Sequence, residues 1–351
     1  MEATRLLSGD FSDYYLEPPS PQQLDELKAL RAEALKHPLK VGDALSWQGP
    51  NLHPESLPPA DYPRPTPLPS PHDPRPLLSA LLARDSPAGV GQGWSLRLLE
   101  GVQTGAGHQS QVWRCTVVDG RAVEVGRVVL KLYHQALFPF PGRWSRSLPD
   151  YDSFRWWPAR HAEARESRAY RELSLYQGRD VSLCYGFYEF TLPGAGEVVG
   201  VLLEDLVDDS VPFTALIEDM STTFEQIAEL ARSAFELQHR VHEAGVLHAA
   251  RSELSLHRLK ASWSTVVALG FSNCSLLDTA LQLHARHVAR DRRDDLYPPH
   301  PSGDLFCGQW SDRSMLKNAV YSLLRDEEGA CLRWNAEAKA DPRLSFLEDV
   351  L

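Results

Sequence analysis

Eleven prolines fall within residues 50–76, and this run constrains the fold of the chain more than any other feature. Proline has no backbone N–H to donate and disrupts the interior of helices and sheets. The sequence therefore predicts an extended linker over residues 50–93 rather than part of a packed core. A simple spacer is the favoured interpretation, and a ligand for a partner domain with an aromatic groove is the alternative.

Composition excludes several classes of protein. The net charge of −11 argues against a general nucleic-acid binder, which needs basic residues to replace counterions. The five cysteines form no CxxC pair, so neither a disulfide-rich scaffold nor a cysteine-rich zinc module is expected. The N-terminus lacks the pattern of a secretory signal, and no apolar run approaches the ~20 residues of a membrane span. We expect an intracellular protein, cytoplasmic or nuclear, that binds neither membranes nor nucleic acid.

Residues 1–49 are predicted to form an N-terminal extension with one amphipathic helix. Ser20 suits the N-cap, Pro21 the first turn and Gln23 the third position of a capping box. Apolar residues then recur at helical spacing, and the helix is expected to end near His37 because Pro38 follows.

From Trp94 onwards the sequence pattern changes to short apolar runs bounded by glycine. These runs predict five strands and, between the third and the fourth, one helix from Pro158 to about Tyr176. The strands are expected over residues 95–99, 112–118, 127–133, 181–190 and 197–203. The remainder is predicted to be mainly helical, with Thr222 and Glu225 as the capping box of a long helix. A strand-rich part over 94–203 thus precedes a helix-rich part over 204–351.

Three motifs follow one another along the strand-rich part. Gly105 and Gly107 lie between two strands, where glycine lets a backbone turn approach phosphate groups closely. Lys131 ends an apolar strand, where a charge is costly without a counter-charge. Glu166 lies on the same face of the predicted helix as Tyr170, so its carboxylate is a candidate partner for Lys131. Alone, the glycines more often form just a tight turn, the lysine is more often on the surface, and a solvated glutamate is the alternative to a paired one.

In this order the three motifs resemble those of the small lobe of protein kinases. The sequence of residues 166–186 is similar to that of the divergent kinase-like proteins abundant in fungi. The resemblance covers about residues 94–275. It implies an α+β, two-lobed protein-kinase-like fold, with a small lobe of five antiparallel strands and one helix and a shortened, mainly helical large lobe. It also implies an ATP site, whose expected residues are Gly105, Gly107, Lys131, Glu166, Glu204 and Leu206.

The catalytic positions depart from that family. The resemblance places the general base at Ala250, and the two metal-binding side chains at Ser255 and Ala268. A general base contributes roughly 10²–10⁴ in rate, and phosphoryl transfer depends on Mg²⁺ to neutralise the phosphates. A methyl group provides neither function. No catalytic residue and no metal ion are therefore expected, and ATP binding, if retained, is expected to be weak and independent of metal.

The sequence accordingly predicts a catalytically inactive, pseudokinase-like protein that acts as a binding or scaffold module with a protein partner. The alternative is an active protein kinase or small-molecule phosphotransferase that uses displaced acidic residues, for which Glu253, Asn273 and Asp278 are candidates. Neither the partner nor the oligomeric state follows from the sequence.

Overall fold

The structure is a computed structural model. It describes residues 20–48, 51–57, 94–108, 110–139, 159–194, 196–218, 222–247, 256–262, 264–271, 274–276, 320, 324, 329–342 and 344. The chain divides into two compact units. The first comprises Met1–Pro58, Ser70–Arg168 and Leu183–Asp205, and the second comprises Pro59–Pro69, Ala169–Ser182 and Leu206–Leu351.

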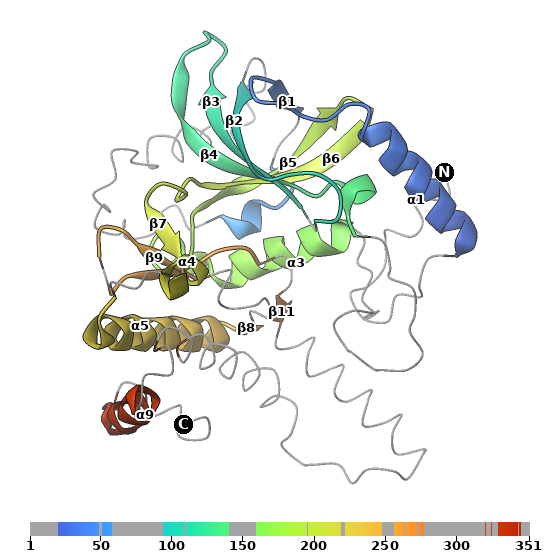
Figure 1. Cartoon of the computed structure of the whole chain (residues 1–351). Coiled ribbons are helices and arrows are strands. Elements are labelled where there is room, and N and C mark those ends of the chain that lie inside the picture. The colour runs from blue at the N-terminus through green and yellow to red at the C-terminus, as the bar shows by residue number, and fades with distance from the viewer. Residues whose placement is uncertain are drawn as a thin grey trace. The chain divides into compact units, whose positions relative to one another are not determined.

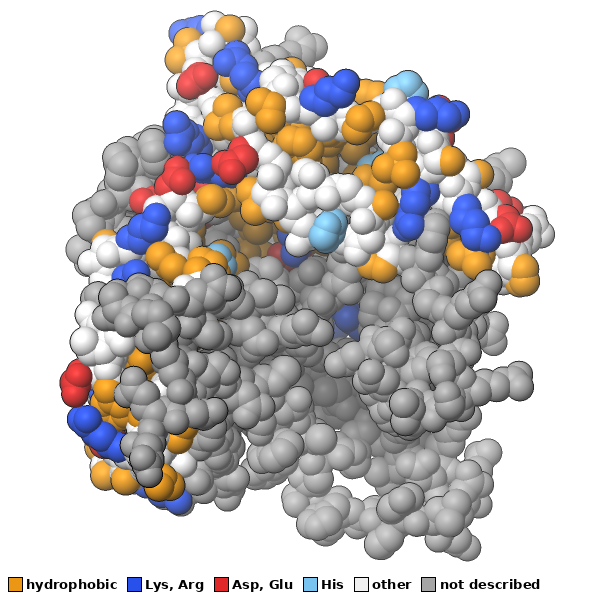
Figure 2. Space-filling view, viewed as in Figure 1, with side chains coloured by type: hydrophobic (Ala, Val, Ile, Leu, Met, Phe, Trp, Pro, Cys, Tyr) orange, Lys and Arg blue, Asp and Glu red, His pale blue; other side chains and the backbone are white. Residues whose placement is uncertain are grey.

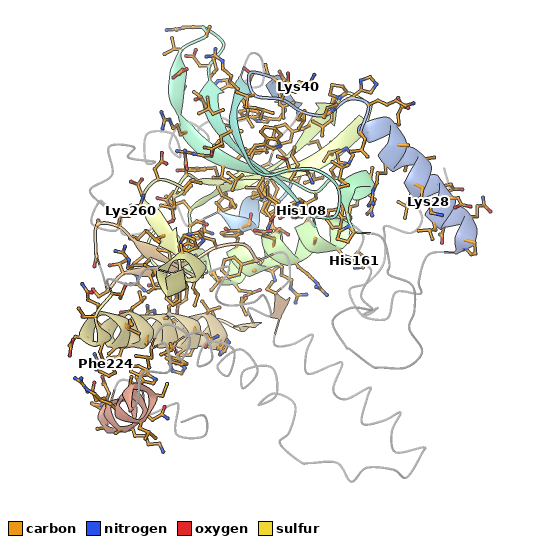
Figure 3. The ribbon with its side chains drawn as sticks, in the orientation of Figure 1. Lys28, Lys40, His108, His161, Phe224 and Lys260 are labelled. Carbon is orange, nitrogen blue, oxygen red and sulfur yellow. The ribbon has the colours of Figure 1, made fainter. Side chains whose placement is uncertain are left out.

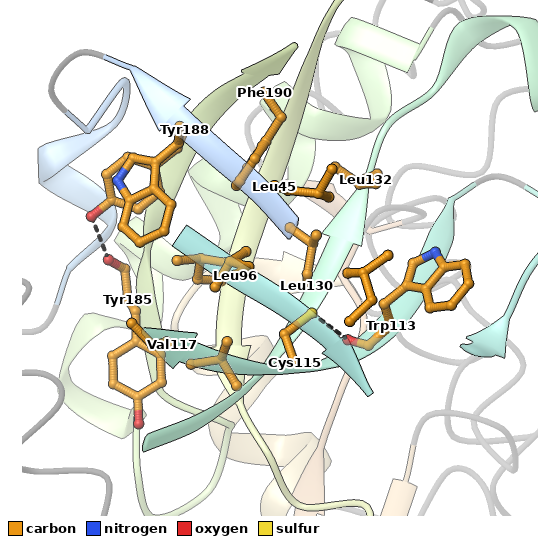
Figure 4. Packing of buried hydrophobic residues seen from close by; sticks show 14 of the residues in the cluster. Leu45, Leu96, Trp113, Cys115, Val117, Leu130, Leu132, Tyr185, Tyr188 and Phe190 are labelled. Atoms are coloured by element: carbon orange, nitrogen blue, oxygen red, sulfur yellow. Dashed lines mark hydrogen bonds between the residues drawn. The ribbon is translucent and has the colours of Figure 1, made fainter. Parts of the chain in front are cut away.

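A closed barrel of six antiparallel strands forms the centre of the first unit (Figure 1). The strands are β1 (Ala44–Gln48), β2 (Ser95–Gln103), β3 (Gln111–Val118), β4 (Glu124–Leu132), β5 (Cys184–Leu192) and β6 (Gly196–Glu204), in the order β1-β2-β3-β4-β6-β5. Side chains alternate across each strand, so every second residue points into the barrel. Figure 4 shows this interior, where Leu96, Cys115 and Leu130 pack together without exposure to solvent.

The predicted two-lobed, protein-kinase-like fold is wrong. The sheet is not five-stranded, because β1 inserts between β2 and β5 and closes it into a barrel. β1 comes from residues 44–48, within the predicted N-terminal extension. The edge strands of an open sheet expose unpaired N–H and C=O groups. Because β1 pairs with β2 on one side and with β5 on the other, it closes the sheet and provides partners for these groups. Trp47 anchors the strand inside the barrel against the rings of Tyr188 and Phe190, at centroid distances of 5.6 and 6.2 Å.

The five strands expected from the sequence are present, each within a few residues of its predicted bounds. The predicted helix is also present as α3 (Ala159–Glu172), followed by the short 3-10 helix η4 (Ser174–Tyr176). α1 (Pro21–Ala34) begins with the predicted capping box, in which the Ser20 and Gln23 side chains bind each other's backbone amides. α1 ends earlier than expected, with Leu35 as its C-cap.

A single 3-10 turn, η3 (Gln135–Leu137), connects three parts of the first unit. The Arg31 guanidinium of α1 donates hydrogen bonds to the carbonyl oxygens of Ala136, at 2.9 Å, and of Phe138. The Gln135 side chain accepts a hydrogen bond of 2.6 Å from the amide of Ala159, the first residue of α3. η3 thus holds both α1 and the start of α3 beside the barrel.

The second unit combines helices with two small sheets. β7 (Ser210–Pro212), β9 (Leu256–Leu259) and β10 (Val266–Ala268) form one sheet, and β8 (Val246–Leu247) pairs with β11 (Ser275–Leu276) in the other. The helices described are α4 (Phe213–Glu218), α5 (Phe224–Glu243) and α9 (Ala330–Ala340). This mixture differs from the predicted, mainly helical large lobe.

Helix α5 is capped one residue later than predicted. Thr223 and Gln226 form its capping box, not Thr222 and Glu225. Both pairs match the same local pattern, so the pattern alone does not choose between them. In the same unit, the ring of Phe235 on α5 stacks on that of Trp334 of α9, which is fully buried.

Candidate functional site

The glycine hairpin joins β2 to β3. Gly105 and Gly107 have φ angles of +92° and +93°, a conformation that glycine adopts without steric cost. Both amides already have partners: Gly105 donates to the Gln111 side chain at 2.6 Å, and Gly107 donates to the Leu137 carbonyl at 2.9 Å. Gln111 also donates back to the Gly105 carbonyl at 2.7 Å. A phosphate group would therefore have to displace these contacts to reach the two amides.

A buried ion pair links the barrel to α3. Val128, Leu130 and Leu132 of β4 point into the barrel, so Lys131 between them points outward towards the helix. Its Nζ lies 2.5 Å from Oε2 of Glu166, and the two side chains are only 8% and 0% exposed. The Tyr133 hydroxyl donates a second hydrogen bond to the same carboxylate oxygen. The predicted pairing of Lys131 with Glu166 is confirmed.

Another cation on the same outer face of the barrel is also neutralised. Arg114 of β3 is directly opposite Val129 of β4, and directly opposite residues point to the same face of a sheet. Lys131 lies two residues after Val129 on β4, so Arg114 and Lys131 share that face. The Arg114 guanidinium donates to Oδ2 of Asp205 from Nε at 3.1 Å and Nη2 at 3.0 Å, and to Oε2 of Glu100 at 3.3 Å. At these two positions the outer face of the strands therefore holds cations that are paired with carboxylates.

Glu204 and Leu206, the last two of the expected ATP-site residues, have structural contacts. Oε2 of Glu204 accepts the Leu183 amide at 3.1 Å, and the Glu204 amide donates to the Leu183 carbonyl at 2.9 Å. Leu206 belongs to the second unit, where it packs with Leu259 and Val267. Residues 204–229 contain eight acidic residues and no lysine or arginine, but Glu204 and Asp205 at the start of this run make internal hydrogen bonds.

Ala268, the predicted position of a lost metal ligand, is the last residue of β10 and is buried. Its amide donates to the carbonyl of Asp180 at 2.9 Å. The Asp180 carboxylate lies in this part of the second unit, but the Arg240 guanidinium binds both its oxygens, at 2.9 and 3.1 Å, and Arg179 binds Oδ2 at 2.8 Å. Asp180 is therefore committed to two arginines and is a poor replacement ligand for Mg²⁺.

Other predicted positions lie outside the described residues. These are Ala250 and Ser255, which the resemblance gave as the general-base position and a metal-ligand position, and the candidate replacements Glu253, Asn273 and Asp278. Within the described ranges, no three histidine, cysteine or acidic side chains gather as they would to hold a metal ion.

Sequence reasoning missed two contacts of α3: the hydrogen bond of Tyr133 to Glu166 and the contact of His53 with Glu163. Tyr133 lies two residues after Lys131, directly after the end of β4, so the alternation of side chains over the predicted strand 127–133 was a signal that would have found it. His53 binds Glu163, one turn before Glu166, at 2.5 Å between Nε2 and Oε1. His53 lies within the proline-rich segment, and no local pattern there points to a partner 110 residues away.

Comparison with known proteins adds no assignment. No protein-family model matches the sequence, and no curated protein matches it either. Among the helices that the structure describes, none has the length and apolar character needed to cross a membrane. Figure 2 shows basic and acidic side chains interspersed over the described part of one face.

Proposed function

We propose that this protein acts by binding a protein partner and does not transfer phosphate, in the manner of a pseudokinase. The proposal takes from the sequence resemblance only the order of the site motifs, not the fold. Its main support is the contrast between two sites. The Lys131–Glu166 pair is present, whereas the expected metal-ligand position is the buried methyl group of Ala268.

The described residues also offer little support for the alternative, an enzyme with displaced acidic groups. Asp180, whose carbonyl binds the Ala268 amide, has its carboxylate held by Arg179 and Arg240. Burial raises the pKa of the Cys115 and Cys184 thiols to about 12, so neither supplies a thiolate nucleophile near neutral pH.

Nucleotide affinity, where present, is proposed to be weak and independent of metal. The phosphates would gain the charge of Lys131 only by competing with Glu166, and the glycine amides only by displacing Gln111 and Leu137. Each displacement lowers the net gain, because a buried group left without its partner costs about 1–3 kcal/mol. ATP in this proposal is a ligand and not a substrate.

The proposed compartment is intracellular, cytoplasmic or nuclear. Among the described residues, Cys115, Cys184, Cys274 and Cys331 form no disulfide bond with one another. Reducing compartments keep cysteines in this form, whereas secreted proteins usually pair them.

Two measurements on the full chain test the proposal. The first is transfer of labelled phosphate from ATP to the protein or to generic acceptors, with Mg²⁺ and with Mn²⁺. We expect no transfer, and transfer that is lost in the Lys131→Met/Glu166→Leu variant would overturn the proposal. This double variant replaces both charges by apolar groups of similar size, so its loss of activity would not reflect an unpaired buried charge.

The second measurement is a titration with ATP, with and without Mg²⁺. We expect weak or undetectable binding that is the same in both conditions. A strong requirement for Mg²⁺ would favour the enzyme.

A further inference from the structure

The segment after β1 is held on the barrel by specific hydrogen bonds. The side-chain oxygen of Asn51 accepts a hydrogen bond of 2.9 Å from the Phe187 amide of β5, and the Leu52 amide donates one of 2.8 Å to the Phe187 carbonyl. Asn51 is itself buried. Residues 51–57, which include the 3-10 helix η2 (Pro54–Ser56), are therefore an ordered part of the first unit.

His53 extends from this segment to α3. Its Nε2 lies 2.5 Å from Oε1 of Glu163, and its ring meets the Phe187 ring edge-on at a centroid distance of 5.3 Å. The His53 side chain is 26% exposed and that of Glu163 is 10% exposed. The contact is thus largely shielded from water, where an ion pair is stronger than on an open surface.

Glu163 and Glu166 are three residues apart, so their side chains leave α3 from the same face. One binds the N-terminal segment through His53, and the other binds β4 through Lys131. The first unit therefore holds the helix at two adjacent points. Loss of the His53 contact would leave Glu166 held by Lys131 and Tyr133 alone, while Gln135 holds only the first residue of α3.

We propose that His53 is a positioning residue, and that the N-terminal segment holds α3 on the barrel through Glu163 and so keeps Lys131 covered by Glu166. The inference concerns contacts within the first unit, and it stands whether or not the protein binds nucleotide. Release of residues 51–57, by a partner or by loss of the His53 charge, would uncover Lys131.

The charge of His53 makes the contact sensitive to pH. Among the described residues, the titratable groups that face its ring are Glu163 from α3 and Glu55 from η2, at 3.4 Å, while β5 contributes the Phe187 ring. Burial lowers the pKa of His53, but the hydrogen bond and charge of Glu163, with those of Glu55, outweigh it, so the pKa is raised. The charged contact is complete below about pH 6.5 and weakens as the pH rises through the raised pKa.

The test is the reactivity of Lys131 towards an amine-modifying reagent, measured by mass spectrometry on the full chain between pH 6 and pH 8. Lys260 of the second unit is exposed and serves as the internal reference (Figure 3). Taking the ratio of Lys131 to Lys260 removes the general effect of pH on lysine reactivity. For the wild-type protein we expect a ratio that rises with pH.

Three variants sharpen the test. His53→Ala should raise the ratio several-fold at pH 6 and remove its pH dependence. His53→Gln keeps an N–H donor for Glu163 without the charge, so it should give a smaller rise that is also independent of pH. Glu55→Gln is the matched control, because Glu55 is the more distant and more exposed partner of His53, and it should have little effect.

Two results would overturn the proposal. One is an unchanged ratio in His53→Ala with no pH dependence in the wild-type protein. The other is faster hydrogen exchange throughout the barrel in the variants, which would show general loss of stability rather than release of α3. If His53→Ala does not fold, His53→Gln and the wild-type pH series decide the question.

Discussion

The ammonium group of Lys131 on β4 and the carboxylate of Glu166 on α3 lie 2.5 Å apart with almost no exposure to solvent. Burial of two opposite charges is tolerable only when each keeps its partner. The pair therefore fixes the position of α3 against the barrel, whatever ligand the protein binds.

Removal of one member of this pair should be much worse than removal of both. Glu166→Gln leaves the Lys131 charge buried without a counter-charge, and we expect it to lower the free energy of unfolding by about 3–5 kcal/mol. The Lys131→Met/Glu166→Leu variant should lose far less, because it buries no charge. Urea denaturation measures both, and equal losses would contradict the prediction.

The sixth strand should be essential to the barrel. Trp47 is buried against Tyr188 and Phe190, and we expect Trp47→Ala to cost about 3–5 kcal/mol. Leu30→Ala on α1 is the control, since Leu30 is exposed and exposed substitutions usually change stability by less than about 0.5 kcal/mol. Comparable thermal shifts for the two variants would argue against closure of the barrel by β1.

Gly186 should not tolerate a side chain. Its φ angle is +122°, and an added Cβ would lie 2.8 Å from the Tyr188 hydroxyl and 2.9 Å from the Asn51 carboxamide. We expect Gly186→Ala to destabilise the protein by about 1–3 kcal/mol from backbone strain alone, and by more because of the crowding. Gly196 also has a positive φ angle, but no atom lies within 4 Å of a Cβ added there. Gly196→Ala therefore measures the cost of backbone strain without the cost of crowding. Chemical denaturation should therefore rank Gly186→Ala clearly below Gly196→Ala.

His134 should lower the stability of the protein in acid. Burial lowers the pKa of its imidazole, so the unfolded chain takes up a proton more readily than the folded one. The folded state is then favoured above about pH 6.5 and loses stability as the pH falls through that value. Urea denaturation of the wild-type protein and of His134→Asn from pH 8 to pH 5 measures the effect.

The difference in stability between these two proteins should shrink or reverse towards pH 5. His53 titrates with the opposite sign, but it is present in both proteins and its effect cancels. A difference that stays constant over the whole range would show that His134 keeps its usual pKa.

Local patterns in the sequence located the glycine hairpin, the five predicted strands, α1 and α3, because capping residues and alternating apolar positions act over a few neighbours. They also identified Lys131 and Glu166 as candidate partners, since both were charged groups on faces expected to be buried. Those patterns did not choose between Thr222 and Thr223 as the cap of α5, because each begins a match to the same motif.

The closed barrel and the contacts of His53 were decided only by tertiary structure. The short β1 pairs with β2 and β5, which begin about 50 and 140 residues further along the chain, so its role depends on edges that exist only once the other strands have paired. His53 likewise meets Glu163 only because Asn51 and Leu52 dock on β5. Pairings at such separations leave no periodic trace in either segment, and packing of the whole unit selects them.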